Sequence, residues 1–271
     1  MRQLALSTHP GPALAVTAVT ALLAIGVGLS PLAIALLSLA MLLGQASVGL
    51  SNDWIDAERD KAVGRTDKPV ALGLISVRAV RSASFVTAAA ALALTALLGP
   101  VALVVHAIFI ASAWSYNLGL KKTALSVLPY VVSFGLLPLL VTVALPEPQP
   151  AAWWALAAGA LLGVSAHFAN VLPDLADDEK TGVRGLPHRL GVRASSVVVA
   201  VALAAASILL ARSPLLWLGV VVATALAATC VVLALTRPPT RLLFRLIIAA
   251  ALVDVVMLAI SGAELTVTLG Q

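Results

Sequence analysis

Charged residues are scarce in this chain. Asp, Glu, Lys and Arg make up 11% of its 271 residues, whereas a soluble domain carries roughly 25%. Hydrophobic residues reach 61%, and the mean hydropathy is +1.06. Because so little charge cannot cover a water-facing surface, the composition excludes an ordinary soluble protein. It indicates an integral membrane protein.

Cysteine and aromatic residues are also rare. The single Cys230 lies in a hydrophobic run and has no partner for an intrachain disulfide. With only 4% aromatic residues, we expect helices packed mainly through Ala, Leu and Val. The sequence pI of about 9.9 does not require a nucleic-acid partner, because basic residues gathered at one membrane face explain it.

Long hydrophobic runs, separated by Pro, Gly or charged residues, cover most of the chain. A transmembrane helix needs about 20 consecutive apolar residues. We therefore predict an all-α bundle of nine transmembrane helices in a single domain over residues 1–271. The predicted spans are Gly11–Leu29, Pro31–Leu50, Val77–Leu98, Val101–Leu118, Thr123–Leu145, Trp153–Leu172, Ala194–Ala211, Pro214–Leu235 and Leu242–Ser261.

The basic residues are divided unequally between the two ends of these spans. Loops after the even-numbered spans share the side of the N-terminus, and all of the 17 Lys and Arg residues except Arg212 lie on that side. Since cytoplasmic loops are rich in Lys and Arg, we predict a cytoplasmic N-terminus in a bacterial-type plasma membrane. The two longest polar loops, 51–76 and 173–193, then lie on the cytoplasmic side together.

Each of these loops, with the end of the span before it, carries an Asn and two Asp residues at every fourth position. These residues are Asn52, Asp56 and Asp60, and Asn170, Asp174 and Asp178. Residues four apart lie on one helical face, and carboxylates gathered there favour a divalent cation between them. Two such faces on one side of the membrane predict a Mg²⁺ site that binds a diphosphate. An ordinary charged surface loop would not explain why the spacing occurs twice.

Three segments resemble signatures of the UbiA-type intramembrane prenyltransferases. The first is NDxxDxxxDxxVxRTxKP at 52–69, where Lys68 stands in the place of an Arg in many members. The second is DxxDDxxxGxR at 174–184, followed by LPxRLG at 186–191. The third is YNxxxKK at 116–122, with Asn117 in the place of Ser. Together with the nine spans, the resemblance covers nearly the whole chain.

The resemblance implies Mg²⁺-dependent transfer of an isoprenyl group from its diphosphate to an acceptor, at the cytoplasmic end of the bundle. It implies a catalytic set of Asp56, Asp60, Asp174 and Asp178. The implied metal ligands are these four with Asn52, Asp53 and Asp177. The residues expected to bind the diphosphate are Asn52, Arg65, Lys68, Tyr116, Lys121, Lys122 and Asn170. For each single Lys or Arg, the alternative interpretation is that it sets the membrane topology and contacts lipid head groups.

Two departures from the family pattern leave the acceptor open. His9-Pro10 stands where many relatives have Arg-Pro, and Phe168-Ala169-Asn170 stands where members that prenylate 4-hydroxybenzoate often have Tyr-Ala. We expect an aromatic acceptor, as in quinone-type or related lipid biosynthesis.

Other functions remain as alternatives. The first is a membrane terpene cyclase, which uses an isoprenyl diphosphate without an acceptor. A transporter or lipid-binding protein is less favoured, because the charge lies almost wholly at one surface. The roles of Asp254 and His167 stay open.

Overall fold

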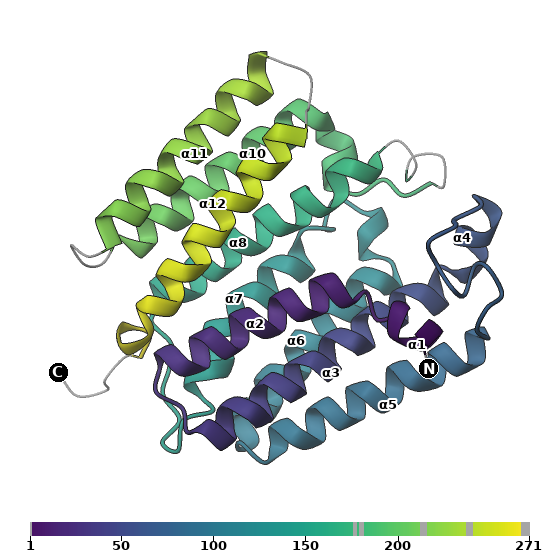
Figure 1. The fold of residues 1–271 in the computed structure, drawn as a ribbon, viewed down its shortest axis with the longest axis horizontal. Coiled ribbons are helices and arrows are strands. Elements are labelled where there is room, and N and C mark those ends of the chain that lie inside the picture. Colours follow the sequence, from purple (N-terminus) through teal and green to yellow (C-terminus); the bar gives the residue numbers. More distant parts are fainter. Residues whose placement is uncertain (1, 176–177, 179–181, 212–215, 237–240, 267–271) are drawn as a thin grey trace.

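The computed structural model describes residues 2–175, 178, 182–211, 216–236 and 241–266, and these ranges form a helical bundle (Figure 1). In chain order the elements are α1 (Arg2–Leu6), α2 (Pro10–Gly26), α3 (Pro31–Ile55), α4 (Ala57–Ala62), α5 (Val77–Ala96), α6 (Pro100–Leu118), η1 (Leu120–Lys122), α7 (Leu128–Thr142), α8 (Trp153–Val171), η2 (Leu172–Asp174), α10 (Leu186–Leu210), α11 (Trp217–Thr236), α12 (Arg241–Ile260) and η4 (Gly262–Glu264).

Each predicted span coincides with one long helix of the described ranges. Five of these helices are long and apolar enough to cross a membrane, namely α3, α5, α6, α8 and α10. The apolar stretches of α2, α7, α11 and α12 within the described residues are shorter. The prediction of an all-α membrane bundle is therefore confirmed, while nine complete spans remain a proposal.

Several helix boundaries follow from local sequence. Pro10, Pro31 and Pro100 begin α2, α3 and α6, at a position where the missing N–H of proline costs nothing. The longest departure from prediction is α10, which begins at Leu186 instead of Ala194. Gly191 interrupts it with φ 76° and ψ 171°, a conformation that suits glycine, so the predicted span corresponds to the part of α10 after this kink.

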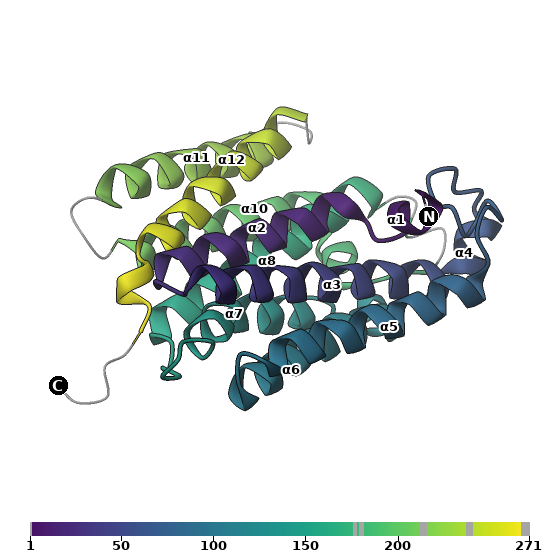
Figure 2. The same cartoon turned by 60° about the horizontal axis from the view of Figure 1, so that its bottom comes forward.

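Neighbours in sequence mostly pack against each other, and the last long helix returns to the first. α3 packs against α2, α5 and α6, and α8 packs against α7 and α10. α10, α11 and α12 pack together, and α12 also contacts α2 (Figures 1 and 2). Large apolar side chains such as Leu32 and Leu218 remain 70% and 75% exposed, as expected of a surface that faces lipid.

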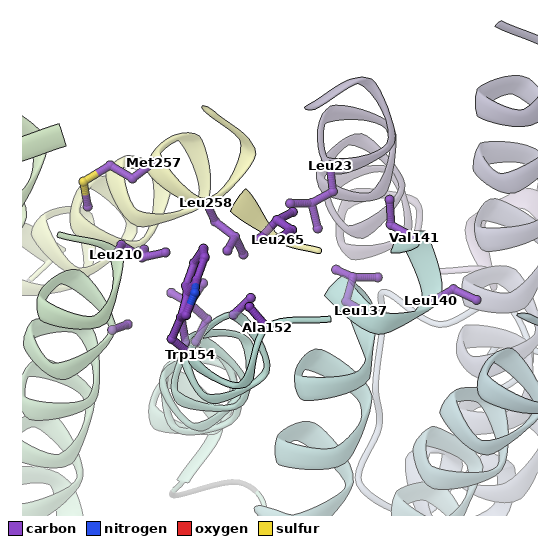
Figure 3. Packing of buried hydrophobic residues seen from close by; sticks show 14 of the residues in the cluster. Leu23, Leu137, Leu140, Val141, Ala152, Trp154, Leu210, Met257, Leu258 and Leu265 are labelled. Carbon is purple, nitrogen blue, oxygen red and sulfur yellow. The ribbon is translucent and has the colours of Figure 1, made fainter. Parts of the chain in front are cut away.

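One end of the bundle is closed by apolar packing. Leu23, Leu137, Trp154 and Leu258 from four helices converge there (Figure 3). Gly26 and Gly262 approach so closely that a Cβ on Gly262 would overlap the backbone of Gly26. A hydrogen bond of 2.7 Å from Ala152 N to Leu265 O adds a further link. The described residues of both polar loops lie at the opposite end (Figure 1).

Candidate active site

The first acidic cluster, which we define as Asp53, Asp56 and Asp60, lies where α3 ends and α4 begins. The structure differs here from the predicted loop, because α3 continues through Asn52 and Asp53 to Ile55. Asp56 separates the helices with φ −89° and ψ 0°. Backbone hydrogen bonds from Asp56 N to Asn52 O and from Asp60 N to Asp56 O bridge the break. The spacing of four residues thus still places these side chains together.

Asp56 is the most heavily engaged carboxylate of the cluster. Its Oδ2 accepts from Lys121 Nζ at 2.5 Å, from Arg59 Nη2 at 3.0 Å and from Asn52 Nδ2 at 3.1 Å. The Asp56 and Lys121 side chains are each only 5% exposed. Burial lowers the pKa of Lys121, and the Asp56 carboxylate acts in the opposite direction. This ion pair joins α3 to the 3₁₀ turn η1 after α6.

Lys68 joins the remaining carboxylates. Its ammonium lies 2.9 Å from Asp60 Oδ2 and 3.2 Å from Asp53 Oδ1, and it donates to Asn52 Oδ1 at 2.8 Å. Three oxygen atoms from the chain therefore surround one positive charge. The signature segment at 52–69 thus folds back so that its last lysine returns to its first residues.

His9 closes the cluster from the side of α2. Its Nε2 lies 2.8 Å from Asp53 Oδ1, and it is the only non-glycine residue in the described ranges with a positive φ, at 52°. Such backbone strain persists where surrounding contacts hold it in place. One such contact is the packing of Thr8 against Gly49, where a Cβ would overlap Thr8 O. His9 therefore occupies a fixed position at the site.

Asn117 fixes the orientation of the Asn52 amide. Its Oδ1 accepts from Asn52 Nδ2 at 3.3 Å, while its own Nδ2 donates to Val48 O at 3.0 Å and to Ser51 Oγ at 2.7 Å. With Asn117 in this position, Asn52 directs its amide nitrogen toward Asp56 and its oxygen toward Lys68. Asn117 thus has a structural reason to replace the Ser of the resembling segment.

The second acidic segment is described only in part. Asn170 lies in the last turn of α8, where its Nδ2 donates to the Tyr130 hydroxyl at 3.4 Å. Asp178 lies 3.6 Å from His188 Nε2. The Asp174 side chain and the whole of Asp177 lie outside the described residues. The predicted stripe of Asn170, Asp174 and Asp178 therefore stays a prediction.

Both segments border one cavity of about 510 Å³. Its polar lining includes Asn52, Asp56, Lys68, Lys121 and Asp178. Its less polar walls come from α2, α3, α6, α7 and α8 and include Val16, Val48, Ala113, Phe134 and Ala166.

Two tyrosine rings form one side of the cavity, and a buried histidine packs against them. The rings of Tyr116 and Tyr130, which both line it, lie 5.4 Å apart and edge to face. Behind them His167 is fully buried, and its Nε2 lies 3.0 Å from Ser126 Oγ. Ser126 Oγ in turn accepts from Leu186 N at 2.8 Å. This contact ties the start of α10 to the segment between η1 and α7.

Comparison with known families decides the identity of the bundle. Residues 13–260 match the UbiA prenyltransferase family. The chain belongs to this family. It is an integral membrane protein and an enzyme of the UbiA type, as the motifs indicated.

Solved structures of UbiA homologs share the fold. One from Archaeoglobus fulgidus bound to GPP and Mg²⁺ has a TM-score of 0.69 at 15% identity, covering 96% of this chain and 99% of that one. An apo homolog from Aeropyrum pernix K1 has a TM-score of 0.68 at 20% identity, covering 89% and 94%. A digeranylgeranylglyceryl phosphate synthase has a TM-score of 0.67 at 18% identity, covering 97% and 98%. No curated protein matches.

Within this UbiA-type site, the predicted residues divide into two groups. Those that the structure brings to the cavity or the ion-pair network are Asn52, Asp53, Asp56, Asp60, Lys68, Tyr116, Lys121, Asn170 and Asp178. Arg65 borders the cavity but forms a two-pronged pair with Asp67, both contacts at 2.8 Å. Lys122 is exposed and does not line the cavity.

Sequence reasoning missed four contributors, namely His9, Arg59, Asn117 and His188. His9 and Asn117 departed from the family pattern, and that departure was the available signal. Arg59 lies inside the first signature and His188 inside the second. The positions of Arg59 and His188 in the sequence do not distinguish a residue of the site from a charged residue on the surface.

The donor chemistry of the first cluster fits Mg²⁺, which prefers carboxylate and carbonyl oxygen. The Lys68 ammonium stands among such oxygen atoms, which shows that they can surround a cation. Among the described residues, however, no three His, Cys, Asp or Glu side chains are arranged to hold a metal ion. The carboxylates are already paired with protein cations.

Proposed function

We propose that this protein transfers an isoprenyl group from an isoprenyl diphosphate to an acceptor in a Mg²⁺-dependent reaction. The observation that carries the proposal is that carboxylates and lysines lie beside apolar walls in one and the same cavity. A diphosphate and an isoprenoid chain need these two environments in direct contact. The A. fulgidus homolog bound to GPP or DMAPP with Mg²⁺ supports the choice of substrate.

Each set of polar residues has a role in this proposal. The metal would be held by Asn52, Asp53, Asp56 and Asp60 with Asp174, Asp177 and Asp178 of the second segment. When bound, Mg²⁺ neutralises charge that develops on the departing diphosphate. Lys68 and Lys121 bind diphosphate oxygens, and the Tyr116 hydroxyl donates to the same group. Arg65, which borders the cavity, and Lys122, which follows Lys121, would add positive charge that attracts the diphosphate.

The apolar part of the cavity governs the fate of the isoprenyl group. As the bond between carbon and diphosphate oxygen breaks, positive charge develops on the allylic carbon. Walls such as Val48 and Phe134 exclude water, which would otherwise react with that carbon. The electron-rich acceptor attacks it, a new bond forms, and the acceptor releases a proton. We expect an aromatic acceptor bordering Tyr116 and Tyr130.

We further propose that all nine long helices span the membrane with the N-terminus in the cytoplasm. The distribution of Lys and Arg supports this orientation. Single cysteines introduced near Asp60, Lys121 and Asp178 in a Cys230→Ser background should react with a reagent applied from the cytoplasmic side. A cysteine at Glu147 should react from the other side. Labelling of the Asp60 and Asp178 loops from opposite faces would exclude a shared site.

The reaction is tested by incubating purified protein with Mg²⁺, isoprenyl diphosphates of different lengths and a panel of aromatic acceptors. Mass spectrometry should detect a prenylated acceptor that is absent when EDTA is added. Cyclised hydrocarbon or alcohol formed without any acceptor would support the cyclase alternative instead. If no diphosphate is consumed under any condition, the proposal fails.

A further inference from the structure

We infer that the lysines of the first acidic cluster are built-in counter-ions, so that the protein takes up Mg²⁺ tightly only together with the diphosphate. This inference rests on the proposed function and adds an order of binding to it. Lys68 and Lys121 hold the carboxylates until a diphosphate arrives, and then transfer their contacts to the diphosphate oxygens.

The first observation is that the cluster is electrically balanced. Three carboxylates face three Lys or Arg side chains at distances from 2.5 to 3.3 Å. They are Asp53, Asp56 and Asp60, and Arg59, Lys68 and Lys121. The three carboxylate residues are only 2–4% exposed. A divalent ion entering alone would leave this buried cluster with a surplus positive charge, which is costly away from water.

The second observation is that Lys68 occupies the position of a bound cation. Its ammonium nitrogen lies 2.8–3.2 Å from oxygen atoms of Asn52, Asp53 and Asp60, donating a hydrogen bond to the Asn52 amide and forming ion pairs with the two carboxylates. The same side chain is 8% exposed. A metal ion cannot share this group of oxygens until the ammonium leaves.

The third observation concerns Asp56 Oδ2, the carboxylate oxygen that accepts the hydrogen bonds of the ion-pair network. Asp56 Oδ2 already accepts from three nitrogen donors, Lys121 Nζ, Arg59 Nη2 and Asn52 Nδ2. An oxygen with three donors has no free lone pair for a metal. At least one donor must therefore move before a metal can bind Asp56 through Oδ2.

The diphosphate provides the place to which these donors move. Lys68, Lys121 and Arg59 all line the cavity, so an anion bound there lies within reach of each of them. Its negative charge compensates the cations that leave the carboxylates, and the freed carboxylates then accept the metal. Binding of the two ligands is therefore cooperative, and each raises the affinity of the protein for the other by the same factor.

The test measures Mn²⁺ binding by electron paramagnetic resonance on the full-length protein in detergent, after dialysis at matched free Mn²⁺. Wild-type protein should bind Mn²⁺ weakly alone and at least ~10-fold more tightly with inorganic pyrophosphate present. Removing a charge-assisted contact is worth ~1.5–3 kcal/mol, or roughly 10- to 150-fold. Lys68→Met should therefore bind Mn²⁺ without pyrophosphate by about that factor more tightly than wild type.

Two further variants complete the design. Lys121→Met frees Asp56 Oδ2 and should show the same gain, which keeps the inference testable if Lys68→Met does not fold. Lys61→Met is the matched control, because Lys61 is an exposed lysine of α4, and its Mn²⁺ affinity should equal that of wild type. Equal Mn²⁺ affinity of wild type with and without pyrophosphate would overturn the inference, as would unchanged affinity in folded Lys68→Met and Lys121→Met.

A separate result bears on the proposed function. If the same preparations convert no isoprenyl diphosphate while Mn²⁺ still binds cooperatively with pyrophosphate, the proposed reaction is wrong and the counter-ion inference stands. Turnover together with tight Mn²⁺ binding in the absence of pyrophosphate would support the proposed reaction and overturn the counter-ion inference.

Discussion

Different interactions stabilise the buried residues at the two ends of the bundle. At the closed end, Leu23, Trp154 and Leu258 pack in the hydrophobic core, and Gly26 meets Gly262 backbone to backbone. At the charged end, buried carboxylates are held by Lys68, Lys121 and Arg59 around a cavity.

The difference shows where adaptation to function lies. Apolar packing cannot exchange partners without opening voids, so the closed end suits a fixed scaffold. Ion pairs can exchange one anion for another, so the charged end suits the binding and release of a diphosphate. We expect substitutions at the two ends to separate stability from activity.

The largest effect is expected at the charged end. Asp56→Ala removes a proposed metal ligand, takes the Asp56 carboxylate from Lys121 and leaves Arg59 with Asp60. Losing one group that supports charge in the transition state typically costs ~100- to 1,000-fold in rate, so we expect prenyl transfer to fall at least ~100-fold. Product formation at saturating Mg²⁺ measures this effect. Asp56→Asn preserves shape and separates lost charge from disturbed packing. Full activity of Asp56→Ala would remove Asp56 from the site.

The lysines should have the next largest effect. Lys121→Ala and Lys68→Ala should each weaken use of the isoprenyl diphosphate by ~10- to 150-fold, seen in kcat/KM for that substrate. Lys61→Ala should leave it unchanged, since Lys61 is exposed on α4. Lys122→Ala should have a smaller effect than Lys121→Ala. Equal, small effects for Lys68, Lys121 and Lys61 would mean that these residues only set the orientation of the protein in the membrane and do not bind the diphosphate.

A substitution at the closed end should lower the thermal stability of the protein and leave substrate binding unchanged. In Gly262→Ala the new Cβ meets the backbone of Gly26, and overpacking of this kind typically costs ~1–3 kcal/mol. We expect a lower thermal unfolding midpoint in detergent, while KM for the isoprenyl diphosphate in the folded fraction stays unchanged. A large rise in KM without loss of thermal stability would show that the two ends are coupled.

The smallest effect is expected for the exposed pair of Arg65 and Asp67. The hydrogen bond from Arg65 lowers the pKa of Asp67 from 3.8 to about 2. A lowered pKa contributes stability that is present above pH 3.8 and is lost as the pH falls toward 2. Because Asp67 is 62% exposed, Asp67→Asn should change stability by less than ~1 kcal/mol at neutral pH. Thermal unfolding at neutral pH would measure this, and a large loss would contradict the solvent-exposed geometry.

The sequence predicted the scaffold well because its signals are local. Hydrophobic runs located every long helix to within a few residues at most boundaries, and the largest error, at α10, came from the helical segment before Gly191. The spacing of Asn52, Asp56 and Asp60 predicted that these side chains gather, although the helix breaks at Asp56. Hydrogen bonds across the break preserve the relation.

Partners that come from distant segments could not be read from spacing. His9 and Asn117 reach the first cluster from 44 and 65 residues away, and no local pattern encodes such a distance. The sequence likewise did not separate Lys121, which is buried against Asp56, from its exposed neighbour Lys122.

By itself, the sequence determined that the chain is a helical membrane protein. It also predicted that the two acidic segments lie at the same end of the helical bundle. Both inferences rest on apolar runs and charged residues that can be read directly along the chain. Only the tertiary structure decided which cation meets which carboxylate. Each pair depends on how α3, η1 and the 63–76 segment pack around a shared cavity. That packing brings Lys121 to Asp56 and so completes the charge balance of the first acidic cluster, whose other two cations, Arg59 and Lys68, lie in the first motif itself.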